Sequence, residues 1–209
     1  MNPRSDSTRA AGKGGRSPAS PLSEPTDAEL LAAHVAGDDR AFNTLMERHA
    51  DRLWSIAIRV MNRREDAADA LQDAMISAFR RAADFRGDAA VTTWLHRIVL
   101  NACFDRLRRL AARPADPLPE DLDRSLQFAS TRDDPEAAAV RSCLADEVTE
   151  ALGRIGPDQR AALVLVDLEG YSMDQAARIL GCAPGTVKSR CSRGRAKLAV
   201  LLQHLKEVD

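Results

Sequence analysis

The chain has 209 residues, of which 44% are hydrophobic and 29% are charged, and its net charge is -1. This length allows one ordinary domain or two small ones. It contains no long uncharged apolar run, which argues against a membrane span and predicts a soluble protein. A net charge near zero does not by itself predict a nucleic-acid partner, so the distribution of charge along the chain is more informative.

The start of the chain and the cysteines indicate a cytoplasmic protein. Residues 1–25 are rich in Ser, Pro, Gly and Arg, lack the apolar core of a secretory signal, and are predicted to form a disordered tail. The four cysteines are scattered, with no Cys-x-x-Cys pair and no histidine at ligand spacing: Cys103, Cys143, Cys182 and Cys191. We therefore expect reduced thiols, no structural metal and no cofactor.

Four helices are predicted between residues 26 and 112, because apolar residues recur there at spacings of three and four. The first begins at Thr26, which forms a capping-box pattern with Glu29, and it ends at Gly37. The second is expected to bury Phe42, Leu45, Met46, His49, Leu53, Ala57 and Ile58. The third, at about 64–83, is expected to bury Ala67, Leu71, Met75, Ala78 and Phe79. The fourth, at about 90–110, is expected to bury Val91, Trp94, Leu95, Ile98, Val99 and Ala102.

Residues 113–138 have the composition of a linker. Pro114, Pro117 and Pro119 interrupt any helix, and acidic residues outnumber basic ones. Helical periodicity resumes near Glu136. The sequence therefore predicts an all-α fold with two small helical domains, residues 26–112 and 139–209, joined by a flexible acidic linker.

The last part of the chain has the pattern of a helix-turn-helix. Ser172 and Gln175 form a second capping-box pattern, and Gly181 provides a residue suited to a sharp turn. Pro184 suits the first turn of a new helix. These signals predict a first helix at 172–180 and a reading helix at 184–198, the arrangement that places a helix in the major groove of DNA.

The predicted reading helix has one polar and cationic face, and no acidic residue occurs between Gln175 and Lys206. Such a face can neutralise phosphates and direct arginine donors at guanine edges. A basic amphipathic helix is also often just a solvated surface, so this feature alone does not establish DNA binding. Ala183 offers no side-chain cap, which leaves the amides of Gly185 and Thr186 as a predicted phosphate site.

Two further groups of polar residues occur in the first domain. Asp66, Asp69 and Asp73 lie on one face of the third helix, either as a solvated stripe or as a protein-binding face, and without an inward histidine they do not predict a metal site. On the fourth helix, an aromatic side chain occurs among hydrogen-bonding and cationic groups: Trp94, His96, Arg97 and Asn101. This combination can stack unpaired bases and hold a backbone, although a tryptophan is more often part of a core.

In this order, the motifs resemble those of bacterial RNA polymerase sigma factors of the sigma-70 family, specifically the extracytoplasmic-function type (group four). Residues 65–74 (EDAADALQDA) look like the region-2 segment that binds the β′ clamp helices of the polymerase. Residues 85–88 (FRGD) and 93–102 (TWLHRIVLNA) are similar to the segment that captures and melts the -10 element. Residues 185–190 (GTVKSR) with 193–195 (RGR) are similar to the region-4 helix that reads the -35 element. Within the family, the motifs look closest to an actinobacterial subgroup.

The resemblance implies a role for particular residues of this chain. Polymerase binding falls on Asp66, Asp69, Gln72 and Asp73, and contacts to the -10 element fall on Arg86, Trp94, Arg97, Asn101, Arg106 and Arg108. Contacts to the -35 element fall on Thr186, Lys188, Ser189, Arg190, Arg193, Arg195 and Lys197. The implied partners are core RNA polymerase, through its β′ clamp helices and β flap, promoter DNA, and an anti-sigma factor.

Some questions stay open at the level of the sequence. The acidic linker is either a flexible spacer or a segment that runs through the polymerase channels and mimics RNA. His96 and Ala183 depart from residues common in the family, so the promoter sequence does not carry over. The resemblance implies a specificity factor rather than an enzyme. The alternatives are a stand-alone helix-turn-helix regulator, which would bind its operator without polymerase, and an all-helical adaptor, which would not bind DNA.

Overall fold

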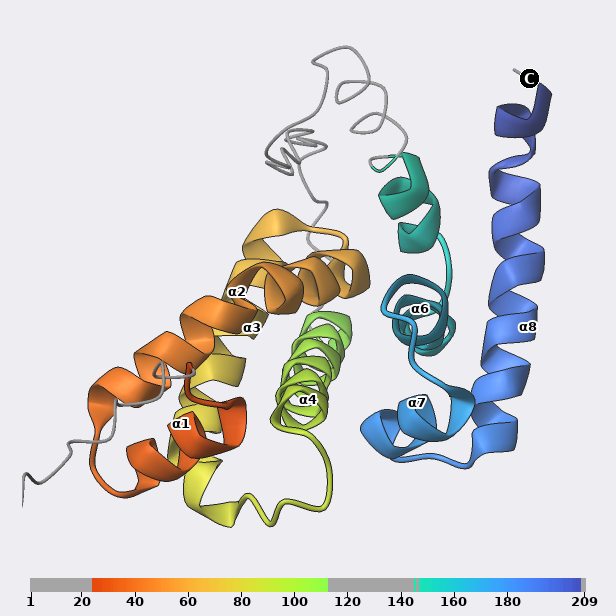
Figure 1. Ribbon diagram of the computed structural model, residues 1–209. Coiled ribbons are helices and arrows are strands. Elements are labelled where there is room, and N and C mark those ends of the chain that lie inside the picture. Colours follow the sequence, from red (N-terminus) through yellow and green to blue (C-terminus); the bar gives the residue numbers. More distant parts are fainter. Residues whose placement is uncertain (1–23, 113–144, 146, 208–209) are drawn as a thin grey trace, which may run out of the picture.

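The computed structural model describes residues 24–112, 145 and 147–207, and all of the regular structure in these ranges is helical (Figure 1). The predicted all-α fold is therefore confirmed. Most of the predicted tail, all of the predicted linker and the expected helix start near Glu136 lie outside the described residues. Among the helices in the described ranges, none has both the length and the apolar character that a membrane crossing requires.

The first domain is a four-helix unit of α1 (Asp27–Val35), α2 (Asp39–Met61), α3 (Arg64–Arg81) and α4 (Val91–Ala112), with a 3-10 turn η1 (Ala82–Asp84) after α3. Thr26 and Glu29 form the predicted capping box at the start of α1. Gly37, with φ of +104°, lets the chain turn between α1 and α2. Asn62 ends α2 in the left-handed conformation.

The buried face of α3 differs from the predicted one. Its core contacts come from a stripe of alanines, Ala67, Ala70, Ala74 and Ala78, all at most 2% exposed. Met75 and Phe79 are 39% and 46% exposed, so their assignment to the core was wrong. Small alanine side chains let α3 approach α2 and α4 closely. Because the alanine face packs against these helices, the larger side chains of Met75 and Phe79 lie on the outer side of α3.

The second domain begins in a helix that includes residues 147–153 and continues through α6 (Pro157–Leu163), a π-helical turn η2 (Val164–Leu168), α7 (Met173–Leu180), α8 (Pro184–Leu201) and a short η3 (Gln203–Glu207). Gly194 of α8 faces α6, where an added Cβ would lie 2.7 Å from Cδ1 of Leu163. A glycine is needed at this position because the two helices pack so closely.

The two domains pack against each other. One continuous cluster of buried hydrophobic residues includes side chains from both, and α4 lies beside α7 (Figure 1). Arg160 of α6 is only 6% exposed and donates to the carbonyl oxygens of Val60 at 2.6 Å and Ile155 at 3.2 Å. The guanidinium group therefore joins the end of α2 to the second domain.

The described cysteines are free thiols, in line with the expected reduced state. Cys103 and Cys191 are fully buried, and burial raises the pKa of the Cys103 thiol to about 12. A thiol with so high a pKa is unreactive at neutral pH, because the thiolate is the reactive form.

Candidate nucleic-acid interface

The predicted helix-turn-helix is present in α7 and α8. The Ser172 hydroxyl accepts a hydrogen bond from the Gln175 amide, and the Gln175 side chain accepts one from the Ser172 amide, which completes the predicted capping box. Gly181 ends α7 in the left-handed conformation, with φ of +63°. Pro184 occupies the first turn of α8. These short-range interactions hold α8 at a fixed angle to α7.

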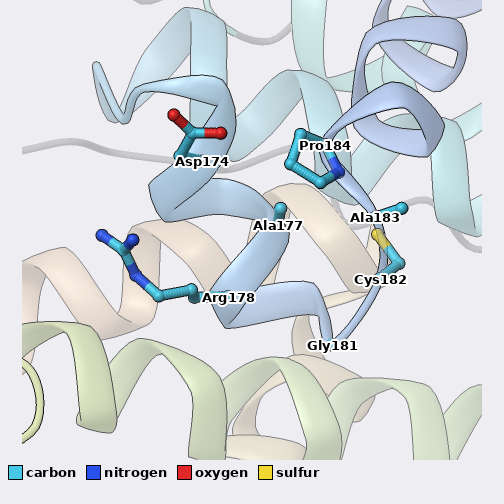
Figure 2. A pocket seen from close by; sticks show the side chains of 7 residues that line it. All are labelled: Asp174, Ala177, Arg178, Gly181, Cys182, Ala183 and Pro184. Carbon is cyan, nitrogen blue, oxygen red and sulfur yellow. The ribbon is translucent and has the colours of Figure 1, made fainter.

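A depression of about 570 Å³ lies at the turn between the two helices (Figure 2). It is lined by Asp174, Ala177, Arg178, Gly181, Cys182, Ala183 and Pro184. As predicted, Ala183 provides no side-chain cap for α8. The amide of Thr186, however, donates to the Ala183 carbonyl at 2.9 Å, so this amide is already used within the turn. The predicted phosphate site therefore loses one of its two donors.

The packed and exposed faces of α8 are clearly separated. Val187, Cys191 and Gly194 are buried. The residues predicted to contact DNA lie on the remaining surface: Lys188, Ser189, Arg193, Arg195 and Lys197 are exposed, and Thr186 and Arg190 are partly buried. The helix thus presents a continuous polar and cationic face to the solvent.

Two of the cations on this face have carboxylate partners inside the second domain. Arg190 pairs with Asp158 of α6 at 2.8 Å, and Arg195 donates to both oxygens of Asp167 at 3.0 and 2.6 Å. Arg193 donates only along its own helix, to the carbonyl oxygen of Ser189 at 3.3 Å. Among the described residues no ion pair is recorded for Arg193, so its charge is available to an anionic partner.

On α4, the structure separates His96 from the other residues of its group. Arg97 and Asn101 are exposed, as are Arg86 and Arg108, and Trp94 is partly buried with its ring 5.6 Å from that of Phe85. His96 is fully buried instead, and its Nδ1 forms a hydrogen bond with the Tyr171 hydroxyl at 2.7 Å. The hypothesis that His96 lies among exposed base-stacking groups was wrong, because α7 and the segment before it cover this side of α4.

The acidic face of α3 is partly internal. Asp66 is only 6% exposed and accepts two hydrogen bonds from Arg106 of α4, at 3.1 and 2.9 Å. Asp69 also pairs with Arg106, at 2.6 Å, and Asp73 pairs with Arg109 at 2.9 Å. Asp69 and Asp73 nevertheless remain exposed, as does Gln72. The structure thus joins Asp66, predicted to bind a protein, with Arg106, predicted to bind DNA.

Sequence reasoning missed an apolar patch beside these acids. Met75, Ile76 and Phe79 are 39 to 46% exposed on α3, and Val35 of α1 is 52% exposed. The alanines at positions 67, 70, 74 and 78 could have revealed this patch. Only one face of α3 packs into the core, and the alanines and the larger apolar side chains cannot both occupy it. An acidic face next to exposed apolar side chains is typical of a protein-binding surface.

Two family models match this chain: Sigma-70 region 2 over residues 45–113, and Sigma-70, region 4 over residues 145–198. The ECF RNA polymerase sigma factor SigM of Mycobacterium tuberculosis is 52% identical over 200 residues, which cover 94% of this chain and 91% of that relative. The chain belongs to the extracytoplasmic-function (ECF) family of sigma factors. The predicted family and its actinobacterial subgroup, the SigM type, are thereby confirmed.

Other members of the family and two solved structures are also similar to this sigma factor. The RNA polymerase sigma-H factor of Pseudomonas aeruginosa is 32% identical, with 88% of this chain and 97% of the relative covered. The complex of CnrH with the cytosolic domain of CnrY matches with a TM-score of 0.60 and 29% identity, over 85% of this chain and 97% of that chain. The sigma factor RpoE of Bartonella quintana, in complex with the anti-sigma factor NepR, matches with a TM-score of 0.57 and 25% identity, over 78% and 96%.

Proposed function

We propose that this sigma factor divides promoter recognition among three helices. The α3 face binds core RNA polymerase, α8 reads the -35 element in the major groove, and α4 holds the unpaired non-template strand of the -10 element. The observation that carries the proposal is the outward cationic face of α8 on a capped helix-turn-helix, with Lys188, Arg193 and Lys197 exposed. In such a motif the second helix lies in the major groove.

Recognition of the -35 element depends most on Arg193 in this proposal. Arginine can donate two hydrogen bonds to one guanine, and Arg193 gives up no ion pair to do so, whereas Arg190 and Arg195 must first leave their carboxylates. Arg190 and Arg195 therefore fit better as groups that exchange one anionic partner for another, a carboxylate for a phosphate.

The Arg193→Ala variant is expected to weaken binding of the holoenzyme to a -35 duplex by about 1 to 2 kcal/mol, which is roughly tenfold. Fluorescence anisotropy with matched and base-substituted duplexes measures the change. Arg154→Ala is the matched control, because Arg154 is an exposed arginine of the same domain that pairs with Glu150 near Leu201, at the C-terminal end of α8. Equal affinity of wild type and Arg193→Ala would place base readout at another residue.

Opening of the -10 region requires no ATP in this scheme. Separating duplex DNA costs about 1.4 kcal/mol per base-pair step, and stacking of freed bases on aromatic side chains returns a similar amount per base. We assign Trp94 and Asn101 to the freed strand and the exposed Arg86, Arg97 and Arg108 to its phosphates. Arg106 fits this role less well, since its guanidinium group is engaged by Asp66 and Asp69.

Polymerase binding is assigned to the exposed part of α3. Asp69, Gln72 and Asp73 supply polar contacts, and Met75 and Phe79 supply the apolar area that a stable interface requires. The buried Asp66 supports this surface from within by holding Arg106.

Replacing both Asp69 and Asp73 by Ala is expected to lower the affinity for core polymerase by roughly tenfold, with each carboxylate contributing about 0.7 kcal/mol, while leaving DNA binding by the second domain unchanged. Surface-immobilised core polymerase gives the affinity directly. The control is Asp105→Ala, which removes an exposed carboxylate that pairs with Arg108 on α4. A similar loss in the control would mean that net charge, rather than the α3 face, governs binding.

The proposed function as a whole is tested by transcription with purified core polymerase. Adding this sigma factor should produce new start sites, each preceded by a shared pair of -35 and -10 sequences. Unchanged start sites would overturn the proposal and favour a stand-alone regulator or an adaptor. We further propose that the protein acts in the cytoplasm, catalyses no reaction itself, and is held inactive by an anti-sigma factor, as the solved complexes of CnrH and RpoE suggest.

A further inference from the structure

The reading helix α8 packs on its own domain through a narrow buried stripe. Val187, Cys191 and Gly194 form this stripe, and α8 lies alongside α6 (Figure 1). With about 3.6 residues per turn, Arg190 and Arg195 lie on opposite sides of the stripe, each roughly 70° from its centre. The two arginines therefore lie at the two edges of the contact between α8 and the rest of the second domain.

At one edge, Arg190 is bound to the start of α6. Its guanidinium group donates to a carboxylate oxygen of Asp158 at 2.8 Å. The same group lies 3.7 Å from the sulfur of Cys182, in the turn before α8. Only 21% of the Arg190 side chain is exposed, compared with 61% of the Asp158 side chain. The Arg190 side chain thus lies along its own domain, where Asp158 occupies part of its hydrogen-bonding capacity.

At the other edge, Arg195 is bound by Asp167 of η2. Two nitrogens of the guanidinium group donate to the two carboxylate oxygens, at 3.0 and 2.6 Å. Arginine binds a phosphate group with the same two-point geometry. Arg195 has 54% of its side chain exposed, so an anion from solvent can reach it. The Asp167 carboxylate therefore occupies the donors that a DNA phosphate would use.

The other cations of α8 are not engaged in this way. Lys188, Arg193 and Lys197 are exposed and form no ion pair with any residue that the structure describes. The helix thus carries one set of cations that is open to an anionic ligand and a second set that is already bound by carboxylates. A phosphate can bind the second set only by displacing Asp158 or Asp167, so the free energy of each ion pair is subtracted from that of DNA binding.

Resting on the proposed function, we propose that Asp158 and Asp167 are internal substitutes for phosphate, which weaken the binding of α8 to DNA. In the free protein, each carboxylate takes the place of a DNA phosphate on one arginine. When DNA binds, a phosphate replaces the carboxylate, which becomes hydrated. Both acids are positioning residues, because they act through Arg190 and Arg195 and do not contact DNA themselves.

Weak binding by α8 makes the two domains depend on each other at a promoter. When two linked sites bind one partner, the second binding event is intramolecular, so neither site has to bind strongly by itself. A second domain with all of its cations free would bind any duplex more tightly, because contacts to phosphates carry no sequence information. The two carboxylates reduce this contribution. Stable binding then also requires the first domain and the polymerase.

The test uses holoenzyme assembled from the full-length sigma factor with Asp158→Asn and Asp167→Asn, which remove both charges and nearly keep the shape of the side chains. Fluorescence anisotropy measures affinity for the -35 duplex and for a base-substituted duplex. Both affinities should rise, by about fivefold at about 50 mM salt, because no ion pair has to be broken. The gain should shrink at about 200 mM salt, which screens exposed ion pairs. Each single substitution should give part of the gain.

Two controls separate the release of the arginines from a general effect of charge. The same Asn substitutions in an Arg190→Gln/Arg195→Gln background should give no gain, because no arginine is left to release. Glu147→Gln/Glu150→Gln removes two other exposed carboxylates of the second domain that are paired with cations, and it should leave the affinity unchanged. Circular dichroism checks that each variant keeps its helices.

The outcomes separate this inference from the proposed function. Wild-type holoenzyme that binds the -35 duplex no better than the base-substituted duplex contradicts readout by α8, and the inference fails with it. Wild type that prefers the -35 duplex, together with folded Asn variants that bind DNA no more tightly, overturns the inference alone. A gain that persists without Arg190 and Arg195, or that also occurs in the glutamate control, overturns it too. A gain that requires the two arginines supports it.

Discussion

Replacing Arg106 by Met is expected to lower the free energy of unfolding of the first domain by about 2 to 3 kcal/mol. The substitution leaves the Asp66 carboxylate, which is 6% exposed, without its strongest partner, and a buried charge that loses its partner is costly. Arg63 remains 3.6 Å from the other carboxylate oxygen and offsets part of the loss. Urea unfolding monitored by circular dichroism measures the change.

Arg108→Met is the matched control for this prediction. Arg108 lies on the same helix, was assigned to the same DNA contact, and has 77% of its side chain exposed, so its loss should alter stability by less than about 0.5 kcal/mol. Asp66→Asn in the Arg106→Met background should recover part of the stability, because the unpaired charge is gone. Equal stability of Arg106→Met and wild type would contradict this stabilising role and make Arg106 again a candidate for contact with DNA.

Between pH 7.5 and pH 5, wild type is expected to lose about 2 kcal/mol of folding free energy through His96 alone. Burial, followed by the nearby positive charges of Arg52 and His49, lowers the pKa of His96 from 6.5 to about 4. The folded protein therefore holds His96 neutral, with its Nδ1 hydrogen-bonded to the Tyr171 hydroxyl. Tyr171 is the group that faces it from the second domain.

The sign of this effect follows from proton binding. Above about pH 6.5 the side chain is neutral whether folded or exposed, and the stabilisation is complete. As the pH falls from 6.5 towards 4, only the exposed state takes up the proton, so stability is lost, by about 3 kcal/mol once pH 4 is reached. A raised histidine pKa would produce the opposite trend.

Urea unfolding of wild type and His96→Gln at the two pH values isolates this contribution. The variant should be less stable than wild type at pH 7.5, and the gap should narrow by about 2 kcal/mol at pH 5, because glutamine does not titrate. His204→Gln is the control, since His204 is exposed at the end of the chain and has 61% of its side chain accessible. Parallel losses in wild type and His96→Gln would contradict a buried neutral histidine.

Local sequence signals predicted the helix-turn-helix well. The hydroxyl and acceptor of each capping box are three residues apart, and the left-handed turn at Gly181 depends on that residue alone. Such interactions form within one or two helical turns and depend little on the rest of the fold. The same signals placed the cations of α8 on its outward face, because Val187 and Cys191 mark the packed side.

The pairing of charges could not be predicted in this way. Asp66 and Arg106 are 40 residues apart, and Arg52 and Glu169 are 117 apart, so no spacing rule connects either pair. The resemblance to the family assigned Asp66 to a protein partner and Arg106 to DNA. Only the crossing of α3 and α4 shows that the two side chains neutralise each other.

By itself, the sequence determined the helical class, the caps and turns, and the cationic face of α8, since each of these follows from interactions among near neighbours in the chain. The tertiary structure alone decided which apolar face of α3 is buried, that Arg190 and Arg195 already have carboxylate partners, and that His96 lies beneath Tyr171. These features arise where helices distant in sequence exclude water from one another, and burial of that kind is a property of the assembled fold rather than of any segment.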